Sequence, residues 1–154
     1  MTLSNLSDKP IGVIGAGSFG TAIANIVAIN RPVWLYARDE KVVAHMQTTA
    51  ENRGQKLHPN VTITNDLPLL ARTCDIIFPM VPSASFRTMM KGLAPYLHPY
   101  HILIHGTKGL DIQLPEGETL QSISSLNRSQ VKTMSEVIRE ESVVVRIGCL
   151  AGPN

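Results

Sequence analysis

The sequence has few charged residues, few cysteines and no long apolar run, and each shortage excludes a class of protein. Charged residues make up 17% of its 154 residues, below the roughly 25% of an average soluble domain, which disfavours a solvated helical bundle. The net charge is only +2 and lysine and arginine form no cluster, so we expect no nucleic-acid partner. No apolar run approaches the roughly 18 residues of a membrane span, and residues 1–10 lack the apolar core of a signal peptide. We therefore expect a cytoplasmic protein with no membrane span.

Cysteine and histidine are also sparse. The two cysteines, Cys74 and Cys149, lie far apart, and each is next to an apolar segment that we expect to be a strand. We predict that both are reduced core residues and that no disulfide forms. The five histidines are not spaced like metal ligands, so we predict no metal site. The sequence has no G-x-S-x-G motif, and hydrolysis has no support.

The most informative stretch is an apolar segment, residues 10–14, that leads into glycines spaced G-x-G-x-x-G and then into small residues from Thr21 to Ala28. Gly15 allows a sharp turn, Gly17 lets the backbone approach a pyrophosphate, and Gly20 allows a helix to pack closely on the strand. The start of that helix offers N–H groups and a positive dipole end to phosphates. This pattern predicts a dinucleotide-binding strand, turn and helix.

Strand-like and helix-like segments alternate along the rest of the chain. Strands are predicted at residues 10–14, 33–37, 61–64, 75–81, 101–105 and 142–150. Helices are predicted at residues 18–30, 40–48, 66–71, 83–96 and 129–140. We interpret residues 49–60 as a loop and the polar residues 112–128 as a surface insertion such as a hairpin. The alternation predicts one domain over residues 1–154, an α/β fold with a doubly wound, mostly parallel Rossmann-type sheet and helices on both faces.

Ligands of such a sheet bind at the carboxyl ends of its strands. Arg38 follows the second strand, where an acidic residue would bind the ribose of NAD and an arginine would pair with the 2′-phosphate of NADP. We therefore favour NADP(H) over NAD(H). The alternative is that Arg38 is a solvated charge and that Asp39 caps the next helix.

Three further polar residues lie at strand ends. Lys108, between glycine-rich neighbours, could hold a phosphate or polarise a carbonyl oxygen, although a solvated surface lysine is the alternative. His105 is expected to be a hydrogen-bonded structural residue. Ser83 is expected to cap the following helix, a role that is compatible with a contact to the cofactor.

Together these residues resemble the N-terminal domain of bacterial-type NAD(P)-dependent glycerol-3-phosphate dehydrogenase. The matching pieces are Gly15-Ala16-Gly17-Ser18-Phe19-Gly20-Thr21-Ala22, Val81-Pro82-Ser83, Thr107-Lys108-Gly109-Leu110 and Gly152-Pro153-Asn154. The cofactor-binding residues expected on this basis are Gly15, Gly17, Ser18, Phe19, Gly20, Arg38, Pro82, Ser83 and Lys108. The resemblance also implies that Lys108 lies between cofactor and substrate, and that Gly152 and Asn154 belong to a substrate loop.

The resemblance implies a reaction as well. The family reduces dihydroxyacetone phosphate to sn-glycerol 3-phosphate, the precursor of the phospholipid backbone. Its catalytic lysine lies in a helical domain that residues 1–154 do not include, so we expect no catalytic residue in this chain and no activity of the chain alone. An intact enzyme could be a homodimer. The sequence departs from the family at Leu57-His58-Pro59, where a Tyr-Leu-Pro run is common, and in the longer stretch at residues 112–128.

Two alternatives stay open from the residues. One is the corresponding half of a β-hydroxyacid or 6-phosphogluconate-type dehydrogenase. The other is a dinucleotide-sensing module without catalysis.

Overall fold

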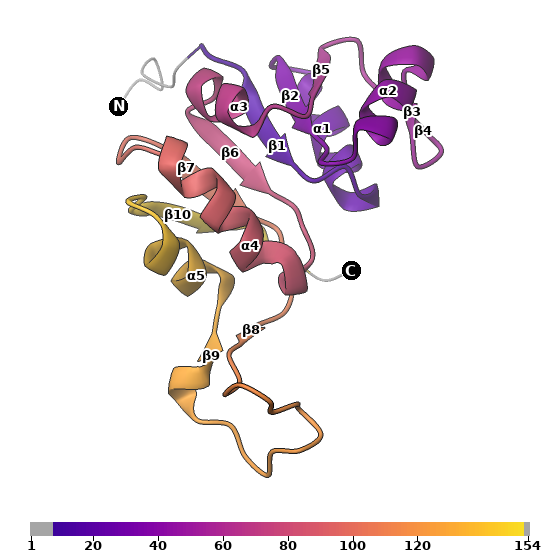
Figure 1. The fold of residues 1–154 in the computed structure, drawn as a ribbon. Helices are drawn as coiled ribbons and strands as arrows, with labels where there is room; N and C mark the ends of the chain where they lie inside the picture. The colour runs from indigo at the N-terminus through magenta and orange to yellow at the C-terminus, as the bar shows by residue number, and fades with distance from the viewer. Residues whose placement is uncertain (1–7, 153–154) are drawn as a thin grey trace.

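The computed structural model describes residues 8–152 and is built around a six-stranded sheet (Figure 1). Its strands are β1 (Ile11–Ile14), β2 (Val33–Tyr36), β5 (Val61–Thr64), β6 (Ile76–Pro79), β7 (Ile102–His105) and β10 (Arg146–Cys149). The helices are α1 (Ser18–Ala28), α2 (Glu40–Thr49), α3 (Leu67–Thr73), α4 (Ser83–Leu93) and α5 (Met134–Glu141), with short 3-10 helices η1 (Ala94–Tyr96) and η2 (Arg128–Gln130). Two small hairpins are formed by β3 (Glu51–Asn52) with β4 (Gln55–Lys56), and by β8 (Asp111–Ile112) with β9 (Val131–Lys132).

All neighbouring strands of the main sheet are parallel, in the order β10-β7-β6-β1-β2-β5. The first strand lies in the middle, where Ile11 is in register with Val33 on one side and Gly12 with Ile77 on the other. The chain thus proceeds outward from β1 in one direction and then in the other. This is the order of a doubly wound dinucleotide-binding sheet, and it confirms the predicted fold class.

Successive residues of β1 face opposite layers of helices, which explains why the whole strand is buried. Val13 lies in a core with Ala24 of α1 and Met46 of α2, whereas Ile14 lies in a core with helices α3, α4 and α5. The apolar residues of α4 belong to the second core: Phe86, Met90 and Leu93 are buried in it, and Met89 packs against it. A parallel sheet covered on both faces needs such continuous apolar strands.

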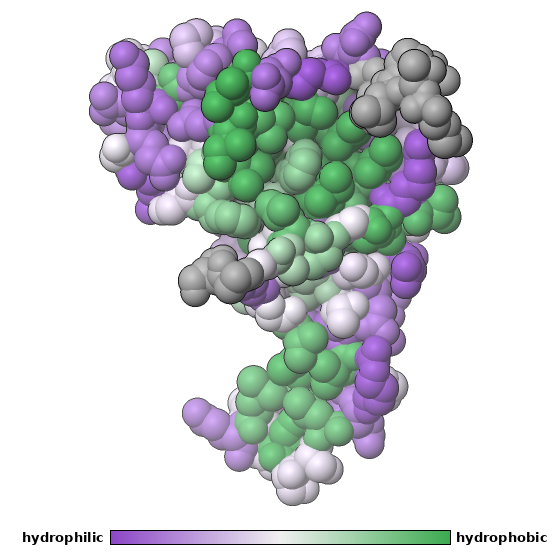
Figure 2. All heavy atoms as spheres, turned by 180° about the vertical axis from the view of Figure 1, so that it is seen from behind, coloured by the Kyte–Doolittle hydropathy of each residue, from purple (hydrophilic) through white to green (hydrophobic). Residues whose placement is uncertain are grey.

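One face of the sheet is covered unevenly. Figure 2 shows a broad apolar surface on the side opposite α4 and α5. In β7, Leu103 and His105 are buried under the helices, whereas Ile102 and Ile104 are only half-buried. Val143 and Val145, which precede β10, are exposed.

The structure corrects three predictions. Residues 49–60 contain the β3–β4 hairpin. The last helix begins at Met134 because residues 131 and 132 pair with β8, and because Thr133 and Glu136 form a capping box at the helix start.

The third correction concerns the cysteines. Both are free, as predicted, but only Cys74 is a core residue, and burial raises the pKa of its thiol to about 12. Cys149 is exposed because β10 is the edge strand of the sheet. No helix within residues 8–152 is long and apolar enough to cross a membrane.

Candidate functional site

A cleft of about 330 Å³ opens at the carboxyl ends of β1, β6 and β7. The order of the strands reverses between β1 and β6, and ligands of doubly wound sheets bind at this point. Three turns, one after each strand, supply the walls. The cleft is lined by Gly17, Ser18, Phe19, Gly20, Met80, Val81, Pro82, Gly106, Thr107 and Lys108.

The turn after β1 is tightly packed at two of its glycines. Gly15 has φ +116°, which glycine adopts without strain, and a Cβ there would lie 2.5 Å from the carbonyl oxygen of Met80. A Cβ on Gly20 would lie 1.9 Å from the carbonyl oxygen of Gly15. The first turn of α1 therefore packs directly on the end of β1.

Gly17 differs from both, because a Cβ at this position would meet nothing within 4 Å. Gly17 is the N-cap of α1, and its carbonyl oxygen accepts the first helical bonds, from the N–H of Thr21 at 2.9 Å and the Thr21 hydroxyl at 2.8 Å. The N–H groups of Ser18, Phe19 and Gly20 precede that first bond, and no side chain caps the helix. An anion can therefore bind in the open space beside Gly17 and accept hydrogen bonds from these N–H groups.

The turn that carries Lys108, after β7, is held against the turn that follows β6. The hydroxyl of Thr107 donates a hydrogen bond of 2.7 Å to the carbonyl oxygen of Val81. Gly109 has φ +117°, and a Cβ there would lie 2.8 Å from the hydroxyl oxygen of Ser83. The Lys108 side chain is exposed and lines the cleft. A cation thus lies across the cleft from the start of α1.

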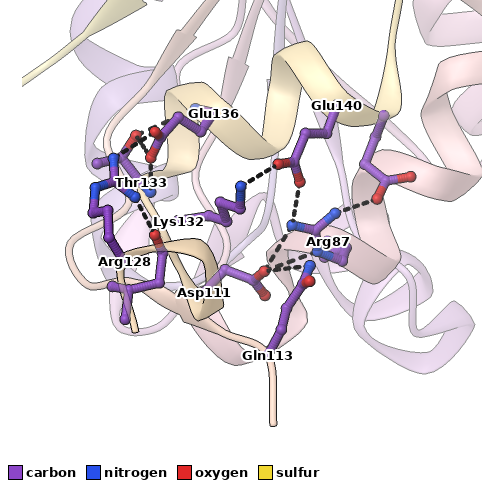
Figure 3. Close-up of polar contacts among 10 residues, drawn as sticks. Arg87, Asp111, Gln113, Arg128, Lys132, Thr133, Glu136 and Glu140 are labelled. Carbon is purple, nitrogen blue, oxygen red and sulfur yellow. Dashed lines mark hydrogen bonds and ion pairs between the residues drawn. The ribbon is translucent and has the colours of Figure 1, made fainter. Parts of the chain in front are cut away.

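A network of charged side chains holds the chain just beyond Lys108 (Figure 3). The guanidinium of Arg87, on α4, pairs with Asp111 of β8 at 2.8 Å, with Glu140 of α5 at 2.8 Å and with Glu141. Lys132 of β9 pairs with Glu140 at 2.9 Å. Burial lowers the pKa of Arg87, but its bonds to the three carboxylates raise it by more. The network fastens the β8–β9 hairpin to both helices.

His105 has a structural environment, as predicted. It is buried, its Nε2 lies 3.0 Å from the hydroxyl oxygen of Ser135, and its ring packs edge-on to Phe86. Burial lowers the pKa of its imidazole. His105 therefore joins the end of β7 to α5 and does not line the cleft.

At the end of β2, the two charged residues have different surroundings. The carboxylate of Asp39 caps α2 by accepting a 2.8 Å hydrogen bond from the N–H of Lys41, which confirms the alternative role weighed for it. Arg38 is exposed and lies outside the lining of the cleft. This arrangement commits the carboxylate to the helix and leaves the guanidinium facing solvent.

The structure brings most of the predicted residues together. Those that line the cleft are Gly17, Ser18, Phe19, Gly20, Pro82 and Lys108. Gly15 packs against the lining residues Met80 and Val81, while Gly152 is exposed beyond β10. Asn154 lies outside the described residues.

One predicted role was wrong. Ser83 is the first residue of α4, with Pro82 as N-cap, and its hydroxyl does not cap the helix; it faces Gly109 instead.

Four residues that line the cleft were not among the predicted site residues: Met80, Val81, Gly106 and Thr107. They follow the carboxyl ends of β6 and β7, and this position was the sequence signal that could have identified them as site residues. Among residues 8–152, no group of three or more histidine, cysteine or acidic side chains could hold a metal ion.

Comparison with known proteins agrees with this geometry. Residues 10–154 match the family model described as the NAD-dependent glycerol-3-phosphate dehydrogenase N-terminus. The chain belongs to this family. It is 40% identical over 157 residues to glycerol-3-phosphate dehydrogenase [NAD(P)+] of Saccharophagus degradans, and 38% identical over 149 residues to that of Teredinibacter turnerae. These matches cover 98% and 94% of this chain but only 39% of each relative.

Solved structures show the same fold. Glycerol-3-phosphate dehydrogenase of Coxiella burnetii matches with a TM-score of 0.74 and 25% identity over 94% of this chain and 41% of that one. The yeast (Saccharomyces cerevisiae) enzyme matches with a TM-score of 0.76 and 21% identity over 95% of this chain and 42% of that one, a likeness of fold alone. The chain spans about two fifths of the length of these proteins.

Proposed function

We propose that the cleft binds NAD(P)H and that the protein transfers hydride between this cofactor and dihydroxyacetone phosphate, giving sn-glycerol 3-phosphate. The observation that carries the proposal is the open space beside Gly17, which faces the first N–H groups of α1 at the point where the strand order reverses. A pyrophosphate has the charge and size to fit there.

When bound, the dinucleotide would supply the hydride. The backbone of Gly17 and Ser18 would hold the pyrophosphate, and Phe19 and Pro82 would form apolar walls beside it. The ammonium of Lys108, across the cleft, would attract the phosphorylated substrate or polarise its carbonyl oxygen. The bond between Thr107 and Val81 would keep that lysine in place.

We further propose that NADPH is preferred to NADH. The Asp39 carboxylate is engaged at the start of α2, so it is a poor partner for a ribose hydroxyl. The exposed guanidinium of Arg38 can pair with a 2′-phosphate through two parallel hydrogen bonds.

Turnover belongs to the whole enzyme in this proposal, because the relatives are more than twice as long as this chain. The remainder would supply the proton to the carbonyl oxygen and most contacts to the substrate, and Gly152 and Asn154 would contribute to substrate binding. Reduction then consumes one hydride and one proton per carbonyl.

Two experiments test the proposal. The first titrates the chain with NADPH and NADH by calorimetry; we expect both to bind, NADPH more tightly, and absence of binding would refute it. The second joins this chain to the remaining part of the Saccharophagus degradans relative and follows NADPH absorbance on addition of dihydroxyacetone phosphate. The chimera should oxidise NADPH, and Lys108→Met should slow it without unfolding it.

A further inference from the structure

The β3–β4 hairpin lies directly against the glycine-rich turn. Asn52 is buried, and its amide nitrogen donates to the carbonyl oxygen of Ala16 at 2.9 Å and to the hydroxyl of Thr21 at 2.8 Å. On the other strand, the side-chain amide nitrogen of Gln55 donates a long hydrogen bond of 3.4 Å to the carbonyl oxygen of Ser18. The hairpin thus contacts the residues on both sides of Gly17.

The two residues between these contacts form the tip of the hairpin. Arg53 has φ +52° and Gly54 has φ +73°. Two positive φ values are typical of a two-residue type I′ turn, which favours Asn-Gly. Arginine is disfavoured at the first position because its Cβ crowds the backbone and it lacks the short polar side chain that lets asparagine adopt this conformation. The turn therefore retains a strained residue where asparagine would fit better, and such strain is concentrated at functional sites.

The side chain of Arg53 is also available for a ligand. It is exposed, and within residues 8–152 no hydrogen bond or ion pair engages its guanidinium. A guanidinium is always charged and binds two oxygens of a phosphate at once. Arg53 does not line the cleft itself, but the contacts of Asn52 to Ala16 and of Gln55 to Ser18 bring the hairpin tip close to the residues on both sides of Gly17. A side chain as long as arginine can extend from that tip toward the open space at Gly17.

We propose that Arg53 binds the pyrophosphate of the dinucleotide, opposite the N–H groups of α1. This inference rests on the proposed function, since it assigns a further ligand to the same cofactor. The role proposed for Arg53 differs from that of Arg38, which is proposed to bind the 2′-phosphate. Loss of Arg53 should therefore weaken NADPH and NADH equally, whereas loss of Arg38 should discriminate between them.

The test is Arg53→Asn in the chain, with dissociation constants for NADPH and NADH by calorimetry and thermal unfolding without cofactor. We expect both dissociation constants to rise at least about tenfold, the usual loss for a hydrogen-bonded charge. The melting temperature should stay the same or rise by about 2–4 °C, because asparagine relieves the turn. A purely structural role would change stability and affinity in the same direction.

Two further variants complete the test. Arg53→Lys keeps the charge but not the paired hydrogen bonds, and it should give an intermediate loss. Arg72→Asn alters another exposed arginine, in the last turn of α3, and should change neither dissociation constant. Unchanged affinity in Arg53→Asn would overturn the proposal, and a loss confined to NADPH would overturn the assignment to the pyrophosphate. If the unaltered chain bound neither dinucleotide, the proposed function itself would fail.

Discussion

The Cα atom of Gly20 lies so close to Gly15 that a Cβ on Gly20 would be 1.9 Å from the Gly15 carbonyl oxygen. That oxygen belongs to backbone and cannot rotate aside as a side chain can. The first turn of α1 and the end of β1 are therefore one packed unit. The contact separates the two roles of the motif, since Gly20 supports the fold whereas Gly17 faces open space.

Gly20→Ala should destabilise the chain by roughly 2 kcal/mol or more, because the added methyl overpacks a backbone contact. Gly92→Ala is a matched control: Gly92 is an exposed residue of α4, and its nearest neighbour to a Cβ would be Leu67 at 3.9 Å. That change should stabilise by roughly 0.5–1 kcal/mol through helix propensity. Urea unfolding measures both, and equal effects would contradict the packing argument.

Gly17→Val should abolish NADPH binding while lowering the melting temperature by only about 2–4 °C, because Gly17 is the N-cap of α1 and valine is a poorer N-cap than glycine. The backbone at Gly17 is extended, with φ −75° and ψ 177°, which valine adopts readily, and no protein atom lies within 4 Å of a Cβ at this position. The valine would instead occupy the space proposed for the pyrophosphate. Calorimetric titration and a melting curve of the same preparation check this. Retained affinity would show that the phosphates bind elsewhere.

Arg38→Ala should weaken NADPH by about tenfold to a hundredfold, the range for a lost hydrogen-bonded charge, and should weaken NADH little. The 2′-phosphate is the only group that distinguishes the two cofactors. Parallel titrations with both would measure the ratio. Equal losses for NADPH and NADH would contradict the assignment of Arg38 to the 2′-phosphate.

The sequence predicted those parts of the molecule where one residue type has one physical use. The spacing of Gly15, Gly17 and Gly20 specifies a strand, a turn and a helix, and alternation of apolar segments specifies a parallel sheet. Asp39 and Asp66 mark helix starts that the structure confirms. In each case the signal is local, so neighbouring residues suffice to interpret it.

Features that depend on distant contacts could not be predicted in this way. The strands of the β3–β4 hairpin have two residues each, too short for a visible alternation, and Asn52 has its partners at positions 16 and 21. Ser83 looked like a helix cap, but Pro82 takes that position. Cys149 lies on an apolar strand, yet its exposure depends on β10 being at the edge of the sheet.

Arg87→Met should lower stability by roughly 1–3 kcal/mol, the cost of leaving hydrogen-bonded carboxylates without their cation. The Arg87 side chain is 18% exposed and that of Asp111 is 16% exposed, so water cannot fully replace the lost contacts. A double-mutant cycle with Asp111→Asn isolates the pair. We expect Arg87→Met to cost much less in the Asp111→Asn background. Additive effects would show that Asp111 does not depend on Arg87.

Glu136→Gln should reduce the loss of stability in acid. The backbone N–H of Thr133, and then the guanidinium of Arg128, lower the pKa of Glu136 from 4.5 to about 2. The folded chain therefore binds fewer protons than the unfolded chain between these values, so this contribution is complete above pH 4.5 and is lost as the pH falls toward 2. Glutamine can keep the capping box but cannot titrate. Melting temperatures from pH 6 to about pH 2 should fall less steeply in the variant. Some acid dependence should persist, because Lys132 and Arg87 also lower the pKa of Glu140. If the melting temperatures of the unaltered chain and of Glu136→Gln fell equally steeply with pH, the titration of Glu136 would not contribute to the acid dependence.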